Sequence, residues 1–382
     1  MKKVQRIDSA FEVLRVFLGI VIAYALCLVI IVLITGADGA KDAIYNFAIG
    51  PFTSRRRFAQ VLSRMCPYML IGCGMCFVYA SGRFSVVSEG IINIAPIPIL
   101  YVIFCTTFGT QIMAGMPKFA NQIIIIVSCA VVGGLVSMIP AYGREKLGAN
   151  EMVTSTIINY VCLYLALWVV RGYMADRSYS FLRTPNFPDN MRFTRYWGNT
   201  NLSEGVWVAI IGVIIACVLF YRTRLGAEIR ITGANPSLAR YAGINEKKNV
   251  ILSMTIAGAL AGFGAGLFYL SGGGEWNPLN STSLPAMGFN GIATALLANS
   301  NPIGTIFSSL FISHISVGGA YLPTKYFPSE IADLISGIII YLCAFSMLFR
   351  GKIQSLLFRN AEKTNVNAEP APAAEKTKKE GK

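Results

Sequence analysis

Residues 121–139 read Asn-Gln-Ile-Ile-Ile-Ile-Val-Ser-Cys-Ala-Val-Val-Gly-Gly-Leu-Val-Ser-Met-Ile and contain no charged side chain. About 20 apolar residues in a helix are enough to cross the hydrocarbon core of a bilayer. A single segment in lipid can satisfy all of its backbone hydrogen bonds only as a helix. This stretch is therefore predicted to be a transmembrane helix, and the rest of the chain repeats its pattern.

The composition of the whole chain agrees with a membrane protein. Of its 382 residues, 54% are hydrophobic and 14% are charged, against roughly 25% charged in an ordinary soluble domain. A chain this apolar has too little polar surface to cover a water-soluble globule, which disfavours a cytosolic enzyme or a disordered scaffold. The formal charge of +14 does not indicate nucleic acid, because the basic residues lie at the edges of apolar runs.

Ten stretches are predicted to cross the membrane. Seven are continuous apolar runs: 13–35, 62–81, 121–139, 153–171, 206–221, 250–270 and 331–349. Three weaker ones are broken by polar or helix-breaking residues: 91–110, 286–299 and 303–321. The predicted fold class is all-α, a polytopic membrane protein of about ten helices with interrupted segments near the bilayer midplane.

The loop 222–249 decides the predicted orientation. It carries six basic and two acidic residues, and loops rich in Lys and Arg face the cytoplasm. With ten crossings, both termini are then cytoplasmic and 172–204 is an external loop. Residues 351–382 are rich in Ala, Pro, Lys and Glu, and are predicted to form a disordered cytoplasmic tail after a membrane domain of residues 1–350.

Two features near the N-terminus bear on this topology. The first apolar run follows a basic head, as a signal peptide does, but its apolar part, 17–34, is longer than the 7 to 15 residues typical of signal sequences. It is therefore kept as a helix. Arg55, Arg56 and Arg57 fall on the predicted outer side, against the positive-inside rule, and the sequence offers no role for them.

The loop 222–249 also contains signals for a short helix. Asn235 is a good N-cap, Pro236 suits the first helical position, and Gly243 can take the left-handed conformation that ends a helix. A helix over 236–242 is predicted. Because so short a helix is marginal in isolation, it is expected to pack against its own protein or a partner. A plain structural linker is an equally good interpretation of these residues alone.

One string within this loop, Thr223–Ile244, reads TRLGAEIRITGANPSLARYAGI. It closely resembles the cytoplasmic signature of permease subunits of ABC importers for simple sugars and nucleosides, a superfamily that also holds branched-chain amino acid permeases. In that family the loop carries the coupling helix that docks onto the ATPase subunit. The resemblance implies a coupling role for seven residues: Gly226, Arg230, Gly233, Asn235, Pro236, Arg240 and Gly243.

Three further segments are similar to the same family. Residues 148–160 look like the motif with which nucleoside-type members enter a span, and 288–304 resemble the family's GxxGIAVALLG…NPxG segment. Residues 84–90 are similar to FNIGxEGQ, but with Ser85 for Asn and Val87 for Gly. These departures lie in membrane-embedded segments, so they bear on the solute more than on the fold. The resemblance covers about 60–350.

Polar side chains inside the predicted spans are candidates for a solute path, because such groups are costly in lipid. They would supply the donors and acceptors that a solute with hydroxyls and ring nitrogens requires. The alternative for each is that it satisfies a helix end or a neighbour. The candidates are Glu89, Asn93, Asn159, Asn290 and Thr294.

No metal, cofactor or catalytic centre is expected. The nine cysteines lie inside or at the ends of apolar runs and are interpreted as small hydrophobes. The Cys73–Cys76 pair lacks further ligands for a tetrahedral zinc site. The sequence contains no GxxxxGK[ST] phosphate loop, so any ATP that drives transport is hydrolysed by another chain.

The resemblance implies a transmembrane permease subunit of an ATP-driven importer that moves a nucleoside or simple sugar across the bacterial plasma membrane by alternating access. It also implies three partner proteins: an ABC ATPase, a second related permease and an external substrate-binding lipoprotein. A branched-chain amino acid permease is the nearest alternative. An ion-coupled secondary transporter using Glu89, and a membrane-embedded enzyme, are more distant ones.

The row Gly258, Gly262 and Gly266 carries a separate prediction that does not depend on the family. With alanines beside them, these residues form small-xxx-small rows on one helix. Such rows allow a neighbouring helix to approach at backbone distance.

Overall fold

The computed structural model describes residues 24–25, 28–29, 31–32, 39–106, 109, 111, 113–174, 188–196, 202–273, 284–321 and 337. These residues are mostly helical, with a single isolated bridge between Arg195 and Ser203 and no extended strand among them. The expected spans at 13–35 and 331–349 lie largely outside the described residues, and the tail at 351–382 lies wholly outside them.

Six helical segments of the described chain are long and apolar enough to cross a membrane. Five are α3 (Arg55–Ala80), α7 (Lys118–Leu147), α8 (Glu151–Val169) with π-helical turn η3 (Val170–Met174), α9 (Gly205–Arg222), and α12 (Glu246–Phe268) with turn η4 (Tyr269–Gly273). The sixth segment is α4 (Ser88–Ile94) followed by α5 (Ile97–Cys105). The chain is thus a multi-pass membrane protein, and the number of ten crossings stays a prediction.

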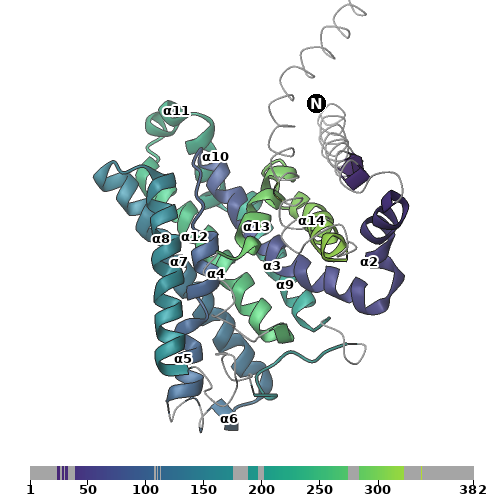
Figure 1. Ribbon diagram of the computed structural model, residues 1–382. Coiled ribbons are helices and arrows are strands. Elements are labelled where there is room, and N and C mark those ends of the chain that lie inside the picture. Colours follow the sequence, from purple (N-terminus) through teal and green to yellow (C-terminus); the bar gives the residue numbers. More distant parts are fainter. Residues whose placement is uncertain are drawn as a thin grey trace, which may run out of the picture.

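Shorter helices complete the described structure. Two are apolar, α13 (Ala286–Leu297) and α14 (Gly304–Ala320). The others are η1 (Tyr45–Ile49), α2 (Gly50–Thr53), α6 (Met113–Gly115), α10 (Arg224–Ala234) and α11 (Pro236–Tyr241). Figure 1 shows α10 and α11 at one end of the long helices and α6 at the other.

The helix ends differ from the predicted spans where polar residues continue a helix beyond the apolar part. Helix α7 runs on through Arg144 and Lys146, and it ends only at Gly148, which is left-handed with φ +68°. Residues 224–234, expected as loop, form helix α10. This helix begins where Thr223 is extended and its Oγ1 accepts a hydrogen bond from the Gly226 N–H.

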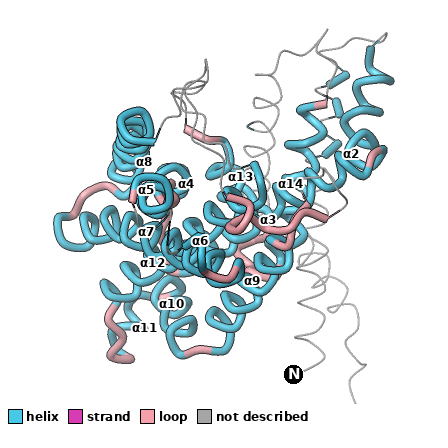
Figure 2. The backbone as a smooth tube through the Cα atoms, turned by 90° about the horizontal axis from the view of Figure 1, so that it is seen from below, coloured by secondary structure: helices cyan, strands magenta, loops and turns pink. Residues whose placement is uncertain are grey.

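The interruption predicted within 91–110 is present, and it lies at Pro96. Helix α4 ends at Ile94, and α5 begins after Pro96. Proline cannot donate the backbone hydrogen bond of a continuous helix, so the segment breaks there. Helix α4 contacts α7, α8, α12 and α13, and the view along the long helices places it among them (Figure 2). The interrupted segment is therefore inside the bundle.

Helices α7 and α12 pack at backbone distance, as the glycine row predicted. A Cβ atom on Gly133 would collide with the carbonyl oxygen of Gly258, and one on Gly262 with the carbonyl oxygen of Cys129. Ser137 Oγ donates a 2.6 Å hydrogen bond to the Met254 carbonyl in the same crossing. Small residues at such a crossing gain dispersion contacts and an interhelical hydrogen bond.

The outward faces of α7, α8 and α9 carry large exposed apolar side chains, such as Leu135, Val161 and Ile215. Helix α3, by contrast, is mostly buried inside the bundle. A face of this kind is stable when lipid covers it. Helices α3 and α4 therefore form the interior of the described bundle, while α7, α8 and α9 face the lipid on one side.

The two adjacent glycines of α7 give a matched test of the crossing. The Gly133→Ala variant is expected to lose about 1–3 kcal/mol of stability because its new methyl group meets main-chain atoms of α12. The Gly134→Ala variant gains the same helix propensity. The nearest neighbour of its new methyl group would lie at 3.4 Å, an ordinary van der Waals distance. Thermal melting in detergent, followed by size-exclusion chromatography, compares them. Equal melting temperatures would refute the backbone contact.

Candidate functional site

Turns from separate parts of the chain meet at the end of the bundle that carries α11. A Cβ on Gly233 of α10 would collide with the Ala80 carbonyl and lie 2.6 Å from the Gly82 nitrogen, so α10 touches the turn after α3. Tyr221 Oη, at the end of α9, donates a 3.0 Å hydrogen bond to Asn301 Oδ1 in the turn between α13 and α14.

An ion-pair cluster joins another part of the same end. Arg83 lies 3.0 Å from Glu145 and 3.5 Å from Glu151, and Arg144 lies 3.6 Å from Glu151. The cluster fastens the 81–87 turn to the end of α7 and the start of α8. It was not predicted, because opposite charges on separate segments can be paired only when the topology is known.

The described part of the predicted external loop lies at the opposite end. Lys118 Nζ donates a 2.8 Å hydrogen bond to Thr194 Oγ1, and the Phe193 N–H donates to the Leu270 carbonyl at 3.1 Å. Residues 188–196 therefore pack against the start of α7 and the end of α12.

The short helix α11 forms as the sequence predicted. Asn235 Oδ1 accepts a 3.1 Å hydrogen bond from the Leu238 N–H, Pro236 occupies the first helical position, and Gly243 is left-handed with φ +72°. The helix ends at Tyr241, one residue before the predicted end. Local cap chemistry is therefore enough to fix its position in the chain.

The outer surface of α11 is open. The side chains of Leu238 and Tyr241 are 57% and 92% exposed. Arg240 makes a bidentate ion pair with Glu246 of α12, with distances of 2.8 and 3.1 Å. The Glu246 hydrogen bond and charge raise the pKa of Arg240, which keeps the guanidinium charged. Helix α11 is thus held on one side and presents two large apolar side chains on the other.

Three other residues of the predicted coupling set, Gly226, Arg230 and Gly233, contact the body of the protein. A Cβ on Gly226 would collide with the carbonyl oxygens at the end of α9. Arg230 lies over the rings of Phe220 and Tyr221, at 5.4 and 5.6 Å from their centroids, a cation–π geometry. Together with the Gly233 contact, these interactions attach α10 to both α9 and the 81–87 turn.

Helix α4 holds the two candidates for which the structure leaves polar atoms unsatisfied. Glu89 is 1% exposed and Asn93 is 6% exposed. Both carboxylate oxygens of Glu89, Nδ2 of Asn93 and Oγ of Ser88 have no hydrogen-bond partner among the described residues. Gly288 of α13 lies directly against Glu89, so that a Cβ there would collide with the carboxylate side chain. Ser88 was not singled out from the sequence.

Asn159 has a different position. Its Oδ1 accepts a 2.9 Å hydrogen bond from the Gly90 N–H, and its Nδ2 donates a 2.8 Å hydrogen bond to the Val86 carbonyl. The Gly90 N–H belongs to the first turn of α4, where N–H groups have no helical partner, and Val86 lies in the turn just before the helix. The Asn159 amide therefore fastens the start of α4 to α8.

Asn290 and Thr294 attach α13 to α3. Asn290 Nδ2 donates a 3.1 Å hydrogen bond to Tyr68 Oη, and Thr294 Oγ1 donates to the Asn290 carbonyl at 2.8 Å. The Thr294 methyl group occupies the space beside Gly72, where a Cβ would lie 2.8 Å from it. Of the five path candidates, the structure thus brings Glu89 and Asn93 together on one helix and gives the other three internal partners.

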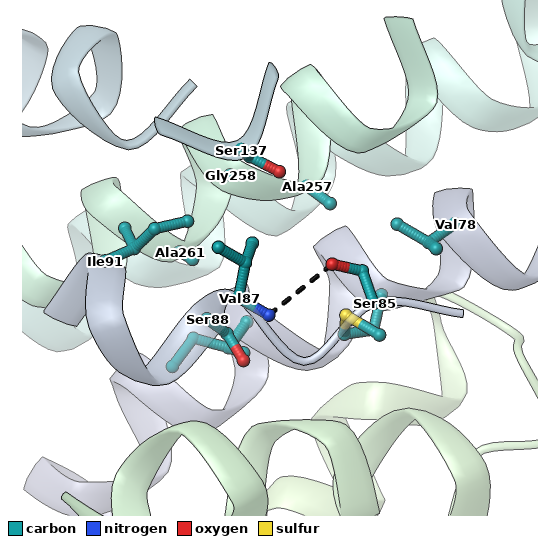
Figure 3. A pocket seen from close by; sticks show the side chains of 11 residues that line it. Val78, Ser85, Val87, Ser88, Ile91, Ser137, Ala257, Gly258 and Ala261 are labelled. Atoms are coloured by element: carbon teal, nitrogen blue, oxygen red, sulfur yellow. Dashed lines mark hydrogen bonds between the residues drawn. The ribbon is translucent and has the colours of Figure 1, made fainter. Parts of the chain in front are cut away.

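A cavity lies behind the start of α4, between α3, α7 and α12 (Figure 3). Its lining includes Ser85, Ser88 and Ser137 among mostly apolar side chains, and its volume is about 10 Å³, room for about one water molecule. Small-molecule sites usually occupy roughly 300–1,000 Å³. The bundle is therefore closed around α4 in this conformation.

The arginine run at 55–57 opens helix α3. Arg55 and Arg56 are exposed, whereas Arg57 lies 4.1 Å over the Tyr321 ring and donates a hydrogen bond to the Gly50 carbonyl. Arg57 therefore has a packing role, and nothing in the structure explains the other two.

A multi-pass helical bundle with an interrupted inner segment and an open, capped helix at one end has the architecture of a membrane permease. The chain belongs to the family described as branched-chain amino acid transport system / permease component, whose model matches residues 57–344. It is a transport permease of this family and not an enzyme.

Named relatives are similar over most of the chain. The nucleoside ABC transporter permease protein NupB of Lactococcus lactis is 29% identical over 87% of this chain and 88% of its own. The guanosine ABC transporter permease protein NupP of Bacillus subtilis is 25% identical over 84% and 90%. The glucose ABC transporter permease protein TsgB13 of Haloferax volcanii is 24% identical over 81% of each.

The position of Asn159 gives a testable consequence. The Asn159→Leu variant leaves the buried Gly90 N–H and the partly buried Val86 carbonyl without partners, and the buried N–H alone is expected to cost about 1–3 kcal/mol. Its melting temperature in detergent should fall clearly. The neighbouring Tyr160→Leu variant, on an exposed face, should melt near the parent. A parent-like melting temperature for Asn159→Leu would show that the amide does not hold α4.

Proposed function

We propose that this chain is the transmembrane permease subunit of an ATP-driven ABC importer that carries a nucleoside or a simple sugar across the bacterial plasma membrane. The observation that carries the proposal is helix α11. It is capped, fixed to α12 by the Arg240–Glu246 pair, and presents Leu238 and Tyr241 outward. The names of the nucleoside, guanosine and glucose permeases support the choice of solute.

The partners follow from this assignment. An ATPase subunit docks on α11 at the cytoplasmic end, and both chain termini lie on that side. A second permease of the same family completes the path. A substrate-binding lipoprotein delivers solute to the opposite end, where residues 188–196 pack against α7 and α12.

The contacts of α10 support a route for the movement. ATP-driven closure of the ATPases pulls α11 and, with it, α10. One contact of α10, at Gly233, reaches the turn that leads into α4. The other, through Arg230 and Tyr221, reaches the Asn301 turn at the end of α13. Both inner segments that carry path candidates are thus moved from one loop, and their separation opens the path.

Branched-chain amino acids are the second candidate solutes, because the family's own description names them. Competition for uptake of a labelled nucleoside separates the two. Excess unlabelled nucleoside should block uptake, and leucine or isoleucine should not. The reverse result would assign the chain to amino acids.

Purification of the chain from its native membrane in mild detergent tests the assembly. An ATPase and a permease of this family, identified by mass spectrometry, are expected to remain bound. If the chain emerges alone from several detergents, the importer assignment fails and an ion-coupled transporter, with Glu89 as the coupling group, becomes the better proposal.

Two variants test the docking role of α11. Arg240→Glu places a like charge against Glu246, and Gly243→Val forces a β-branched residue into the left-handed region. Each variant is expected to lose at least about 1.4 kcal/mol of docking energy, which weakens binding tenfold. ATPase recovery and uptake should therefore fall at least about tenfold. Membrane insertion should be unchanged.

The control for this charge reversal is Arg171→Glu, an exposed change in η3 at the opposite end of the bundle. It should retain the ATPase. Normal uptake by both α11 variants would refute the docking assignment.

A further inference from the structure

Unsatisfied polar atoms gather on helix α4. Oγ of Ser88, both carboxylate oxygens of Glu89 and Nδ2 of Asn93 are buried without a hydrogen-bond partner in the described chain. Each of these side chains is more than nine-tenths buried. Glu89 and Asn93 are four residues apart, so they lie one above the other on the same face of the helix. Glu89 and Asn93 therefore form one polar strip, and Ser88 lies on the neighbouring face, which lines the cavity.

Such a strip is costly unless something binds it. A buried donor or acceptor without a partner carries its full desolvation penalty, and a carboxylate carries the largest. Asn159, Asn290 and Thr294 show that polar groups nearby do find internal partners. The unsatisfied groups on α4 thus stand apart from the structural amides around them.

The surroundings of Glu89 indicate where a partner would come from. In this conformation Gly288, near the start of α13, lies against the Glu89 side chain. No side chain of α13 separates the carboxylate from the helix backbone at that point, because glycine has none. The Glu89 atoms that meet Gly288 are Cγ, Cα and the main-chain N, so the proposed movement of α13 away from α4 would remove cover from this side chain.

We propose that Glu89 binds two neighbouring hydroxyl groups on the sugar ring of the transported solute, with Asn93 donating to an acceptor on the same molecule. This inference rests on the proposed function. The two oxygens of one carboxylate can each accept a hydrogen bond from one of two adjacent hydroxyls. Ribonucleosides and simple sugars share such a pair, so one carboxylate serves both solute classes.

Transport rates of matched nucleosides test this assignment. The complete importer, with the same binding protein throughout, is reconstituted in liposomes and supplied with guanosine, 2′-deoxyguanosine or 3′-deoxyguanosine at saturating concentration. The binding protein is the same in every assay. A difference between parent and variant in the ratio of two nucleoside transport rates therefore reports on the permease. Glu89→Gln is expected to lower the guanosine to deoxyguanosine ratio at least about tenfold. Glu89→Asp should recover part of it.

The control variant is Glu145→Gln. This residue is another poorly exposed glutamate, but it is paired with Arg83 at the end of the bundle. Its rate ratio should equal that of the parent, whatever happens to its absolute rate. An unchanged ratio in Glu89→Gln, with equal slowing of all three nucleosides, would overturn the proposal. So would a changed guanosine to inosine ratio with an unchanged deoxyguanosine ratio, because the carboxylate would then recognise the base.

A second measurement uses the unmodified chain and does not depend on the variant folding. A hydrophobic carbodiimide labels carboxyl groups within the membrane, and mass spectrometry gives the extent of labelling at Glu89. Guanosine should protect Glu89 in the turning-over importer, and 2′,3′-dideoxyguanosine should not. Equal protection by both would contradict recognition of the hydroxyl pair. If the parent importer carries neither nucleosides nor sugars, the proposed function itself fails, which separates the two conclusions.

Discussion

The close crossing of α12 with α7 is the contact on which the described bundle depends. Lipid supplies no hydrophobic drive for helices to associate, so their attraction comes from tight packing and interhelical hydrogen bonds. Glycines at the crossing bring main chains together, and Ser137 adds a hydrogen bond to it. Helix α12 also meets α3, where a Cβ on Gly74 would lie 2.9 Å from the Ala257 carbonyl. This frame encloses the interrupted helix α4.

An interrupted helix inside a membrane needs partners for the backbone groups at its ends, and α4 obtains them from a neighbour rather than from itself. The Asn159 amide satisfies the Gly90 N–H in its first turn and the Val86 carbonyl just before it. The ion pairs of Arg83 hold the turn just before it. The backbone of α4 is therefore well satisfied, while the side chains of Glu89 and Asn93 are not. The contrast separates the groups that build the segment from those that we propose bind the solute.

Features fixed by local chemistry were predictable from the sequence, and features fixed by pairing were not. The cap of α11 needs only Asn235, Pro236 and Gly243, which lie within nine positions of one another. Helix α10 was expected as loop because its residues mix charges with small and polar side chains, and its packing against Gly82 becomes visible only in three dimensions.

The candidate path shows the same division. Asn159 was expected in the path, but its two partners lie about 70 positions earlier in the chain, at the start of another helix. No periodicity reveals which of two buried amides will find such partners. The charge and position of Glu89 were visible in the sequence, whereas its lack of a hydrogen-bond partner and its contact with Gly288, which comes from a distant segment, were not.

The glycine crossing also limits how the sequence can change. Where two side chains touch, enlargement of one can be offset by a smaller residue opposite. At Gly133 and Gly262 the opposing atom is a carbonyl oxygen, which every amino acid carries. No second substitution at the contact removes that oxygen. A larger side chain at either glycine therefore cannot be compensated by a smaller residue on the other helix. Variation among descendants of this chain should instead accumulate on the faces that lipid covers.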